Sequence, residues 1–331
     1  MSAELDFRLL NEFQRGFPLA PRPYARIASE LGVTEGMVLE RLAALQRQGA
    51  IGRVGAVFTP GALGASTLAA LEVPRERLQA VAALVSARPE VNHNYEREGR
   101  INLWFVAMSE SDDRLARVLR EIEEEAACGP LLDLRLVEEF RIDLGFDLSA
   151  SAPTRLALPT PAVERHAPTD AERRLLAALQ EGLPLVAQPY AVLAAAADVE
   201  EDEAIDMLAR WVDDGVIRRL GVIVRHRELG FRANAMVVWA VPDGVVRPLG
   251  LNLAQQDGVT LCYRRQPAGA RWPYNLYCMI HGRSRDAVLE RLQHIRKHTG
   301  LGAFASQTLF SRTRFKQTGA RYVTGKDLAY G

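Results

Sequence analysis

The chain has 331 residues, which is long enough for two or more domains with cores of their own. Hydrophobic residues make up 48% and charged residues 25% of it, a composition typical of a globular protein. The 41 Lys and Arg residues balance 41 Asp and Glu residues, so the formal net charge of zero argues against a nucleic-acid binder, which usually carries a basic excess.

Two copies of one pattern make up most of the chain. Gly49 and Ile51 of the first copy align without gaps to Gly215 and Ile217 of the second, 166 positions further on. A Pro- and Ala-rich stretch, 147–169, separates the copies and is predicted to be a linker. The repeat is far too long for a solenoid, so it predicts a fused pseudo-dimer.

Each copy opens with helical patterns, and Pro23 and Thr34 suit the starts of two of them while Gly49 suits a helix end. Three short helices followed by a two-strand wing are typical of a winged helix-turn-helix, which we expect at 1–60 and at 170–226. The expected helices of the first copy and the wing strands are Leu5–Gln14, Pro23–Leu31, Thr34–Gln48, Ile51–Phe58 and Ile217–Val224.

The period then changes from helical to alternating, and each copy continues in the order βαββαβ. This order predicts a ferredoxin-like unit at 61–146 and another at 227–325, so the fold class is α+β. The expected strands are Ser66–Val73, Val91–Glu98, Ile101–Met108 and Leu131–Ile142, then Ala233–Val241, Val259–Arg265, Tyr274–His281 and Ser306–Gln317. The expected helices are Arg75–Ala87, Asp112–Ala127 and Arg285–His298.

The junctions GAIGRVGAVF (49–58) and GVIRRLGVIV (215–224), in this arrangement of units, resemble the Lrp/AsnC family. Within that family the second copy is similar to siroheme decarboxylases, through HRELGF (226–231), CYRR (262–265) and WPYNLYCMIHG (272–282). The resemblance implies removal of acetate carboxyl groups from siroheme to give didecarboxysiroheme, in haem d1 or alternative haem biosynthesis. It also implies that two related subunits pair, fused here in one chain.

Cations and aromatic residues gather in the second copy. The planar guanidinium group of arginine can both pair with carboxylates and stack on flat rings. A planar macrocycle edged with carboxylates, such as siroheme, needs both interactions. The expected substrate-binding residues are Arg219, Arg225, Tyr263, Arg264, Arg265, Arg271, Trp272, Tyr274, Asn275, Arg312, Arg314 and Lys316, with Tyr95 and Arg97 from the first copy. Two simpler interpretations stay open: a basic row that protects an edge strand, and aromatic residues that only fill the core.

Three histidines are expected to carry the chemistry: His93, His226 and His281. Decarboxylation requires a proton at the carbon that loses CO₂, and imidazole donates protons near neutral pH. His226 or His281 as a ligand to the substrate iron is the alternative. The macrocycle can hold the electron pair, so we expect no separate cofactor. We also expect no metal site built by the protein alone.

The first copy has Thr59-Pro60-Gly61 where the second has Arg225-His226-Arg227. It also lacks a match to WPYNLYCMIHG. We therefore expect one competent pocket per chain, in the second ferredoxin-like unit, with His93 and Arg97 completing it across the pseudo-dimer interface.

The third helical pattern of the second copy, 199–215, carries seven acidic residues against Arg210. Phosphate would repel such a helix, so we expect no DNA partner. Two other functions stay open: an Lrp/AsnC-type transcription regulator and a tetrapyrrole-binding protein without catalysis. Further association, as a homo-oligomer or with related decarboxylase subunits, is also open.

Three widely spaced cysteines, Cys128, Cys262 and Cys278, show neither a disulfide framework nor metal-binding spacing. The N-terminus has no apolar signal region, and no run of residues approaches the length of a membrane span. We expect a cytoplasmic protein with no membrane partner.

Overall fold

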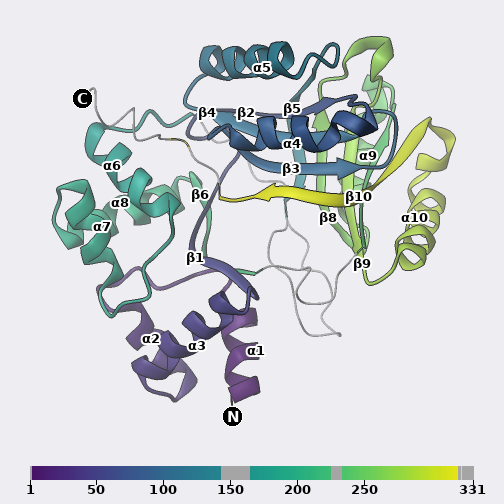
Figure 1. Ribbon diagram of the computed structural model, residues 1–331. Coiled ribbons are helices and arrows are strands. Elements are labelled where there is room, and N and C mark those ends of the chain that lie inside the picture. Colours follow the sequence, from purple (N-terminus) through teal and green to yellow (C-terminus); the bar gives the residue numbers. More distant parts are fainter. Residues whose placement is uncertain (1, 143–164, 225–232, 320–321, 323–331) are drawn as a thin grey trace.

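The computed structural model describes residues 2–142, 165–224, 233–319 and 322 (Figure 1). The helical units of the two copies lie together on one side of the molecule, and the two ferredoxin-like units lie together on the other (Figure 1). The chain is therefore arranged by type of unit, with each copy contributing to both sides. No helix within these described ranges is long and apolar enough to cross a membrane.

Helices in both helical units begin at capping residues that the sequence provides. Thr34 accepts a hydrogen bond from the Met37 amide at 3.3 Å, and Thr169 forms a reciprocal capping box with Glu172. The helices of the first unit are α1 (Ser2–Glu12), α2 (Pro23–Leu31) and α3 (Glu35–Arg47). Those of the second are α6 (Asp170–Gln180), α7 (Pro189–Ala197) and α8 (Glu201–Asp213).

The two helical units share one hydrophobic core, and polar contacts cross between them symmetrically. The Tyr24 hydroxyl donates to the Pro184 carbonyl at 3.1 Å, and the Tyr190 hydroxyl donates to the Pro18 carbonyl at 2.9 Å. Each buried phenol thus satisfies its hydrogen bond in the other copy. The two units fold as one body.

The wing strands, β1 (Ile51–Phe58) and β6 (Ile217–Val224), pair with each other and form a two-stranded antiparallel sheet. Gly55 and Gly221 are opposite each other at its centre. A Cβ atom on Gly221 would lie 2.5 Å from the Phe13 carbonyl oxygen, so only glycine allows the turn after α1 to approach there. Each copy supplies one strand of the wing, and the wing thereby joins the copies.

The ferredoxin-like units have the order expected from the alternating patterns. The strands of the first are β2 (Ala65–Leu71), β3 (Val91–Arg97), β4 (Leu103–Ser109) and β5 (Leu132–Ile142), and its helices are α4 (Leu78–Ala87) and α5 (Asp112–Ala126). The strands of the second are β7 (Ala233–Trp239), β8 (Val259–Arg265), β9 (Leu276–Gly282) and β10 (Ser306–Gln317), and its helices are α9 (Asp243–Ala254) and α10 (Arg285–Thr299).

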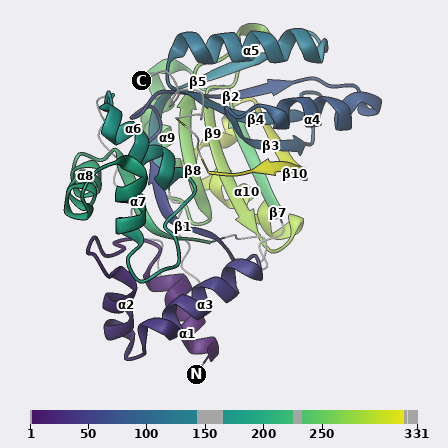
Figure 2. The same cartoon turned by 60° about the vertical axis from the view of Figure 1, so that its left-hand side comes forward.

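The two sheets close into one barrel in the order β10-β3-β4-β2-β5-β8-β9-β7. Strand β5 of the first copy pairs with β8 of the second, and β10 pairs with both β7 and β3. Strand β10 is therefore not an edge strand, and the basic row on it has no edge to protect. Helices α4 and α5 cover the outer face of one half, and α9 and α10 cover the other (Figure 2).

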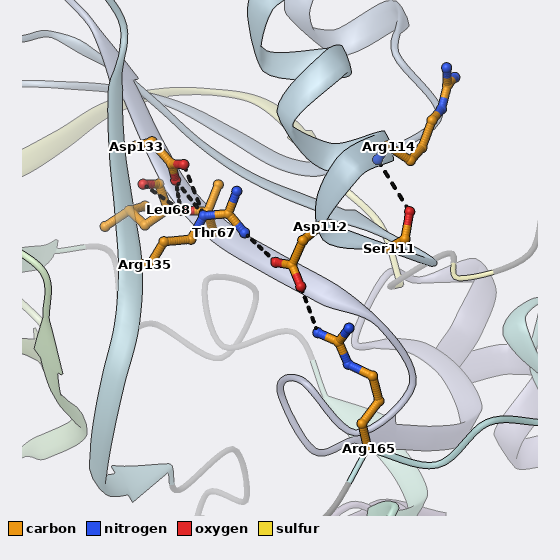
Figure 3. A network of polar contacts seen from close by, with 8 residues as sticks. All are labelled: Thr67, Leu68, Ser111, Asp112, Arg114, Asp133, Arg135 and Arg165. Atoms are coloured by element: carbon orange, nitrogen blue, oxygen red, sulfur yellow. Dashed lines mark hydrogen bonds and ion pairs between the residues drawn. The ribbon is translucent and has the colours of Figure 1, made fainter.

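A polar network fixes the chain where the described part resumes at residue 165 (Figure 3). Arg165 donates to Asp112 at the start of α5 at 3.1 Å, and Arg135 donates to the other oxygen of the same carboxylate at 3.0 Å. Arg135 also pairs with Asp133, which accepts a hydrogen bond from Thr67. The Arg165 and Asp112 side chains are at least half exposed, so this network adds little stability and mainly directs the chain.

Candidate active site

The barrel interior contains two Tyr-x-Arg pairs that are related by the repeat: Tyr95 and Arg97 on β3, and Tyr263 and Arg265 on β8. Arg97 donates to the Leu309 carbonyl at 3.2 Å, and Arg265 donates to the Leu134 carbonyl at 2.8 Å. Each guanidinium also lies near the ring of its own tyrosine, at 5.7 Å and 5.2 Å from the centroid. Each arginine therefore reaches across a seam into the other copy.

Three interior guanidinium groups, those of Arg53, Arg97 and Arg265, form no ion pair with any described residue. Burial lowers the pKa of Arg97 to about 10, and it also lowers the pKa values of Arg53 and Arg265. All three stay charged at neutral pH. Arg97 is buried, whereas Arg53 and Arg265 are half-buried and feel the charges of Glu181 and Asp133. A cation removed from water is normally paired, so these groups favour an anionic ligand.

Arg53 is a candidate site residue that the sequence predictions missed. It stands on β1 at the repeat position of Arg219, which was predicted, and that correspondence was the available signal. Its guanidinium donates to the Ala56 carbonyl of its own strand at 3.2 Å. A Cβ atom on Gly182 would lie 3.0 Å from its side chain, so the glycine makes room for it.

A polar row crosses the barrel from Arg97 to His281. Ser311 is the strand partner of Arg97, and its hydroxyl donates to the Asn234 side-chain oxygen at 2.6 Å. Asn234 is in turn the strand partner of His281, whose Nδ1 lies 3.0 Å from the Thr260 hydroxyl. Burial and then the charge of Arg97 lower the pKa of His281 to about 4.

His93 lies at the other end of β3, where the barrel meets the wing. Its ring stacks on Tyr95 with centroids 6.3 Å apart. Burial and then the charge of Arg53 lower the pKa of His93 to about 4. Both described site histidines are thus neutral at pH 7 in the absence of a ligand, and each has a neighbouring guanidinium.

The equivalent row in the other half of the barrel has no imidazole. Leu136 is the strand partner of Arg265, and Ser66 is the strand partner of Met108. The Asn92 amide donates to the Met108 sulfur at 3.3 Å, at the place of the contact between Thr260 and His281. The two halves of the barrel therefore share their arginines and differ at the position that is His281 in one and Met108 in the other.

Five predicted cations lie away from this interior. Arg264 is on the opposite face of β8 and pairs with Asp243 at 2.7 Å, and the Lys316 ammonium donates to the Ser86 and Arg88 carbonyls at the end of α4. The exposed Arg314 donates to Gln317 at 3.1 Å. The half-buried Arg271 donates to the Pro130 carbonyl, and the exposed Arg312 lies 3.8 Å and 3.9 Å from Glu98 and Glu96.

The remaining predicted residues make contacts within the fold. Trp272 lies in the barrel core, where its indole N–H donates to the Tyr277 hydroxyl at 2.7 Å and its ring packs against Tyr274. The Asn275 amide bonds both backbone groups of Val241, at 2.8 Å and 3.0 Å. Arg219 is buried on β6 opposite Val57.

Arg225 and His226 lie outside the described residues. The structure describes the strands on either side of their segment: Val224 pairs with Ile51 on the wing, and Ala233 pairs with Gly282 beside His281. The segment therefore connects the wing to the strand neighbouring His281.

Comparison with known proteins identifies the family. Residues 62–141 and 228–316 match the AsnC-like ligand binding domain, and 6–51 and 172–218 match the siroheme decarboxylase NirDL-like HTH domain. The chain is 44% identical over 319 residues to the siroheme decarboxylase NirDL subunit of Paracoccus denitrificans, an alignment that covers 96% of this chain and 97% of that protein. The chain belongs to the siroheme decarboxylase family.

Two further relatives of this siroheme decarboxylase family member bear on its architecture. The crystal structure of the siroheme decarboxylase NirDL in complex with an iron-uroporphyrin III analogue superposes with a TM-score of 0.73 at 27% identity, and covers 100% of this chain and 97% of that one. The NirD subunit of Pseudomonas aeruginosa is 51% identical over 148 residues, which are 45% of this chain and 98% of that subunit. The predicted family, fold class and fused form are confirmed, and the family's named activity is that of a carboxy-lyase.

Proposed function

We propose that this chain is a siroheme decarboxylase that removes acetate carboxyl groups from siroheme and leaves methyl groups, to give didecarboxysiroheme. The observation that carries the proposal is the set of three interior cations without an acidic partner among the described residues: Arg53, Arg97 and Arg265. A macrocycle edged with carboxylates would pair with these guanidinium groups, and its flat face suits the tyrosines beside them.

The chemistry needs one bond broken and one proton delivered. The bond between the methylene carbon and the carboxyl carbon breaks, CO₂ leaves, and the electron pair passes into the macrocycle. A proton then joins the methylene carbon, which becomes a methyl group. His281 is our proposed proton donor because it stands in the polar row beside Arg97, with His226 and His93 as further donors.

Substrate binding would itself raise the pKa of His281 and so allow it to act as an acid. In the ligand-free protein His281 has a pKa of about 4, so at pH 7 its ring is neutral and only one of its two nitrogens carries a proton. A substrate carboxylate placed beside Arg97 brings negative charge, which offsets the guanidinium and raises the pKa of the imidazole. The siroheme iron belongs to the substrate, and the proposed reaction needs no separate cofactor.

One half of the barrel carries the reaction in this proposal. Met108 stands where the second copy has His281, and a thioether cannot donate a proton. The first copy then contributes Arg97, Arg53 and His93, while the second contributes His281. This composite pocket explains why the two copies are needed together.

Siroheme and its decarboxylated products are the proposed partners, and related decarboxylase subunits or a second copy are further ones. The exposed acids of α8, among them Asp202, Glu203 and Asp206, support a role without DNA. Three free thiols, of which Cys262 and Cys278 are buried, support a place in the reducing cytoplasm.

Anaerobic incubation with siroheme, followed by mass spectrometry of the extracted pigment, tests the proposal. We expect loss of one or two CO₂ units. A shifted absorption spectrum with unchanged mass would indicate a tetrapyrrole carrier instead. If siroheme does not bind at all, the transcription regulator becomes the better hypothesis, and a gel shift would test it.

A further inference from the structure

The Thr260 hydroxyl makes two contacts at the candidate site. It lies 3.0 Å from His281 Nδ1, and it donates to the Met279 carbonyl oxygen at 3.3 Å. A hydroxyl has one proton and two lone pairs, so donation to the carbonyl leaves Thr260 as the acceptor toward the ring. The ring nitrogen that faces Thr260 must then carry a proton.

We infer that Thr260 is a positioning residue that holds His281 in the Nδ1–H tautomer, so that Nε2 is the nitrogen that gains and loses the catalytic proton. This inference rests on the proposed function of His281. Threonine accepts from Nδ1–H in the neutral ring and in the imidazolium alike. The proton on Nε2 can therefore come and go without any rearrangement around Nδ1.

The same contact also favours protonation of the His281 ring to the imidazolium form. Burial and Arg97 both disfavour the imidazolium form of His281. A hydrogen bond from Nδ1–H to a hydroxyl oxygen is stronger when the ring is charged, and so it works against these two effects. Thr260 also fixes the plane of the ring, because its own position is set by the Met279 carbonyl of the neighbouring strand.

The repeat gives an independent reason to treat Thr260 and His281 as a pair. In the first copy their places are taken by Asn92 and Met108, which also contact each other, at 3.3 Å. The amide of Asn92 donates to the thioether, which accepts hydrogen bonds only weakly. Asn92 donates to Met108 in the first copy, whereas Thr260 accepts from His281 in the second. The two positions have thus exchanged donor and acceptor roles together.

Kinetics of two variants test the role of Thr260. Thr260→Val keeps the shape and removes the hydroxyl, and we expect kcat to fall roughly 10- to 100-fold, the effect of one hydrogen bond to a charged group. KM should stay nearly constant, because Thr260 acts on the ring. Thr260→Ser should restore most of the turnover. Thr308→Val is the matched control, because it makes the same substitution on another strand of the barrel, β10, and it should leave kcat unchanged.

Nitrogen-15 NMR of histidine-labelled protein tests the tautomer directly and does not depend on activity. The signal of His281 is assigned by its absence in His281→Gln. We expect the Nδ1–H tautomer in the wild type and in Thr260→Ser, and a mixture in Thr260→Val. An Nε2–H tautomer in the wild type would overturn the inference, as would equal turnover in the Val and Ser variants. If the wild type fails to release CO₂ from siroheme, only the proposed function fails, because the NMR result still decides the tautomer.

Discussion

The arginines inside the barrel differ from those on its surface in having no acidic partner among the described residues. Arg97 and Arg265 keep a carbonyl each as a hydrogen-bond acceptor, whereas Arg264, one residue along β8, pairs with Asp243 on the outer face. Neighbouring side chains on a strand point to opposite faces. In the proposed function, the same residue type therefore serves ligand binding on one face and surface pairing on the other.

We expect Arg97→Met and Arg265→Met each to weaken siroheme binding roughly 10- to 100-fold, because each loses a hydrogen bond between charged groups. Anaerobic titration followed by absorbance measures the Kd. Arg264→Met is the matched control and should bind like the wild type. Equal Kd values for all three variants would remove the interior arginines from the site.

Siroheme binding near neutral pH should take up protons. His93 and His281 have pKa values of about 4 without ligand, so both rings are neutral at pH 7. Carboxylates bound beside them raise these pKa values, and the rings then bind protons from solution. Calorimetry in buffers of different ionisation enthalpy measures the uptake. His281→Gln should take up less, and a net release by the wild type would contradict the prediction.

At the scale of elements, the strands and their faces were largely predictable from sequence. Alternation correctly placed Tyr263 and Arg265 on one face and Arg264 on the other. It failed on β10, because register shifts between Ser311, Arg314 and Lys316 disturb the pairing with β3. The role of Asn275 was also hidden, since an amide that bonds both backbone groups of Val241 has no periodic signature.

The cross-copy contacts of the site were only partly foreseeable. Sequence indicated that Arg97 would complete the pocket, but the row through Ser311, Asn234 and Thr260 depends on which strands are neighbours. Strand order joins residues that are far apart in the chain, and no local pattern records it. Arg53 was missed because the equivalent position in the second copy, Arg219, lies in the motif RRLGV, which has two arginines and drew the prediction to that copy.

One ion pair connects the wing to the barrel and should matter for stability. Arg218 on β6 donates to Glu139 on β5 at 2.7 Å, and the two side chains are only 13% and 12% exposed. Removing the cation leaves a nearly buried carboxylate without its partner. We expect Arg218→Met to lower the free energy of unfolding by about 3 kcal/mol.

Denaturant unfolding measures that loss, and Arg8→Met is the control. Arg8 pairs with Glu12 at the surface of α1, where one such pair contributes less than about 1 kcal/mol. A loss for Arg218→Met no larger than that of the control would show that the wing and the barrel are held together by apolar packing instead.

At the scale of the whole molecule, the two copies are held together by three seams: the wing, the shared helical core and the closed barrel. A cut within 150–160, inside the predicted linker, should therefore leave one particle. Size-exclusion chromatography of protein cleaved at an inserted protease site tests this, with the same sample in denaturant as the control for complete cleavage. Elution as two separate halves would show that the linker itself holds the copies together.

The closed barrel also imposes an order on folding during synthesis. Strands β3 and β5 emerge early, yet their partners β10 and β8 lie far along the chain. Until those strands are made, the first ferredoxin-like unit exposes two unpaired edges, which are prone to aggregate. Covalent fusion supplies the missing strands from the same ribosome. The half-formed sheet is then completed by strands of its own chain, and it does not depend on diffusion to meet a separate subunit.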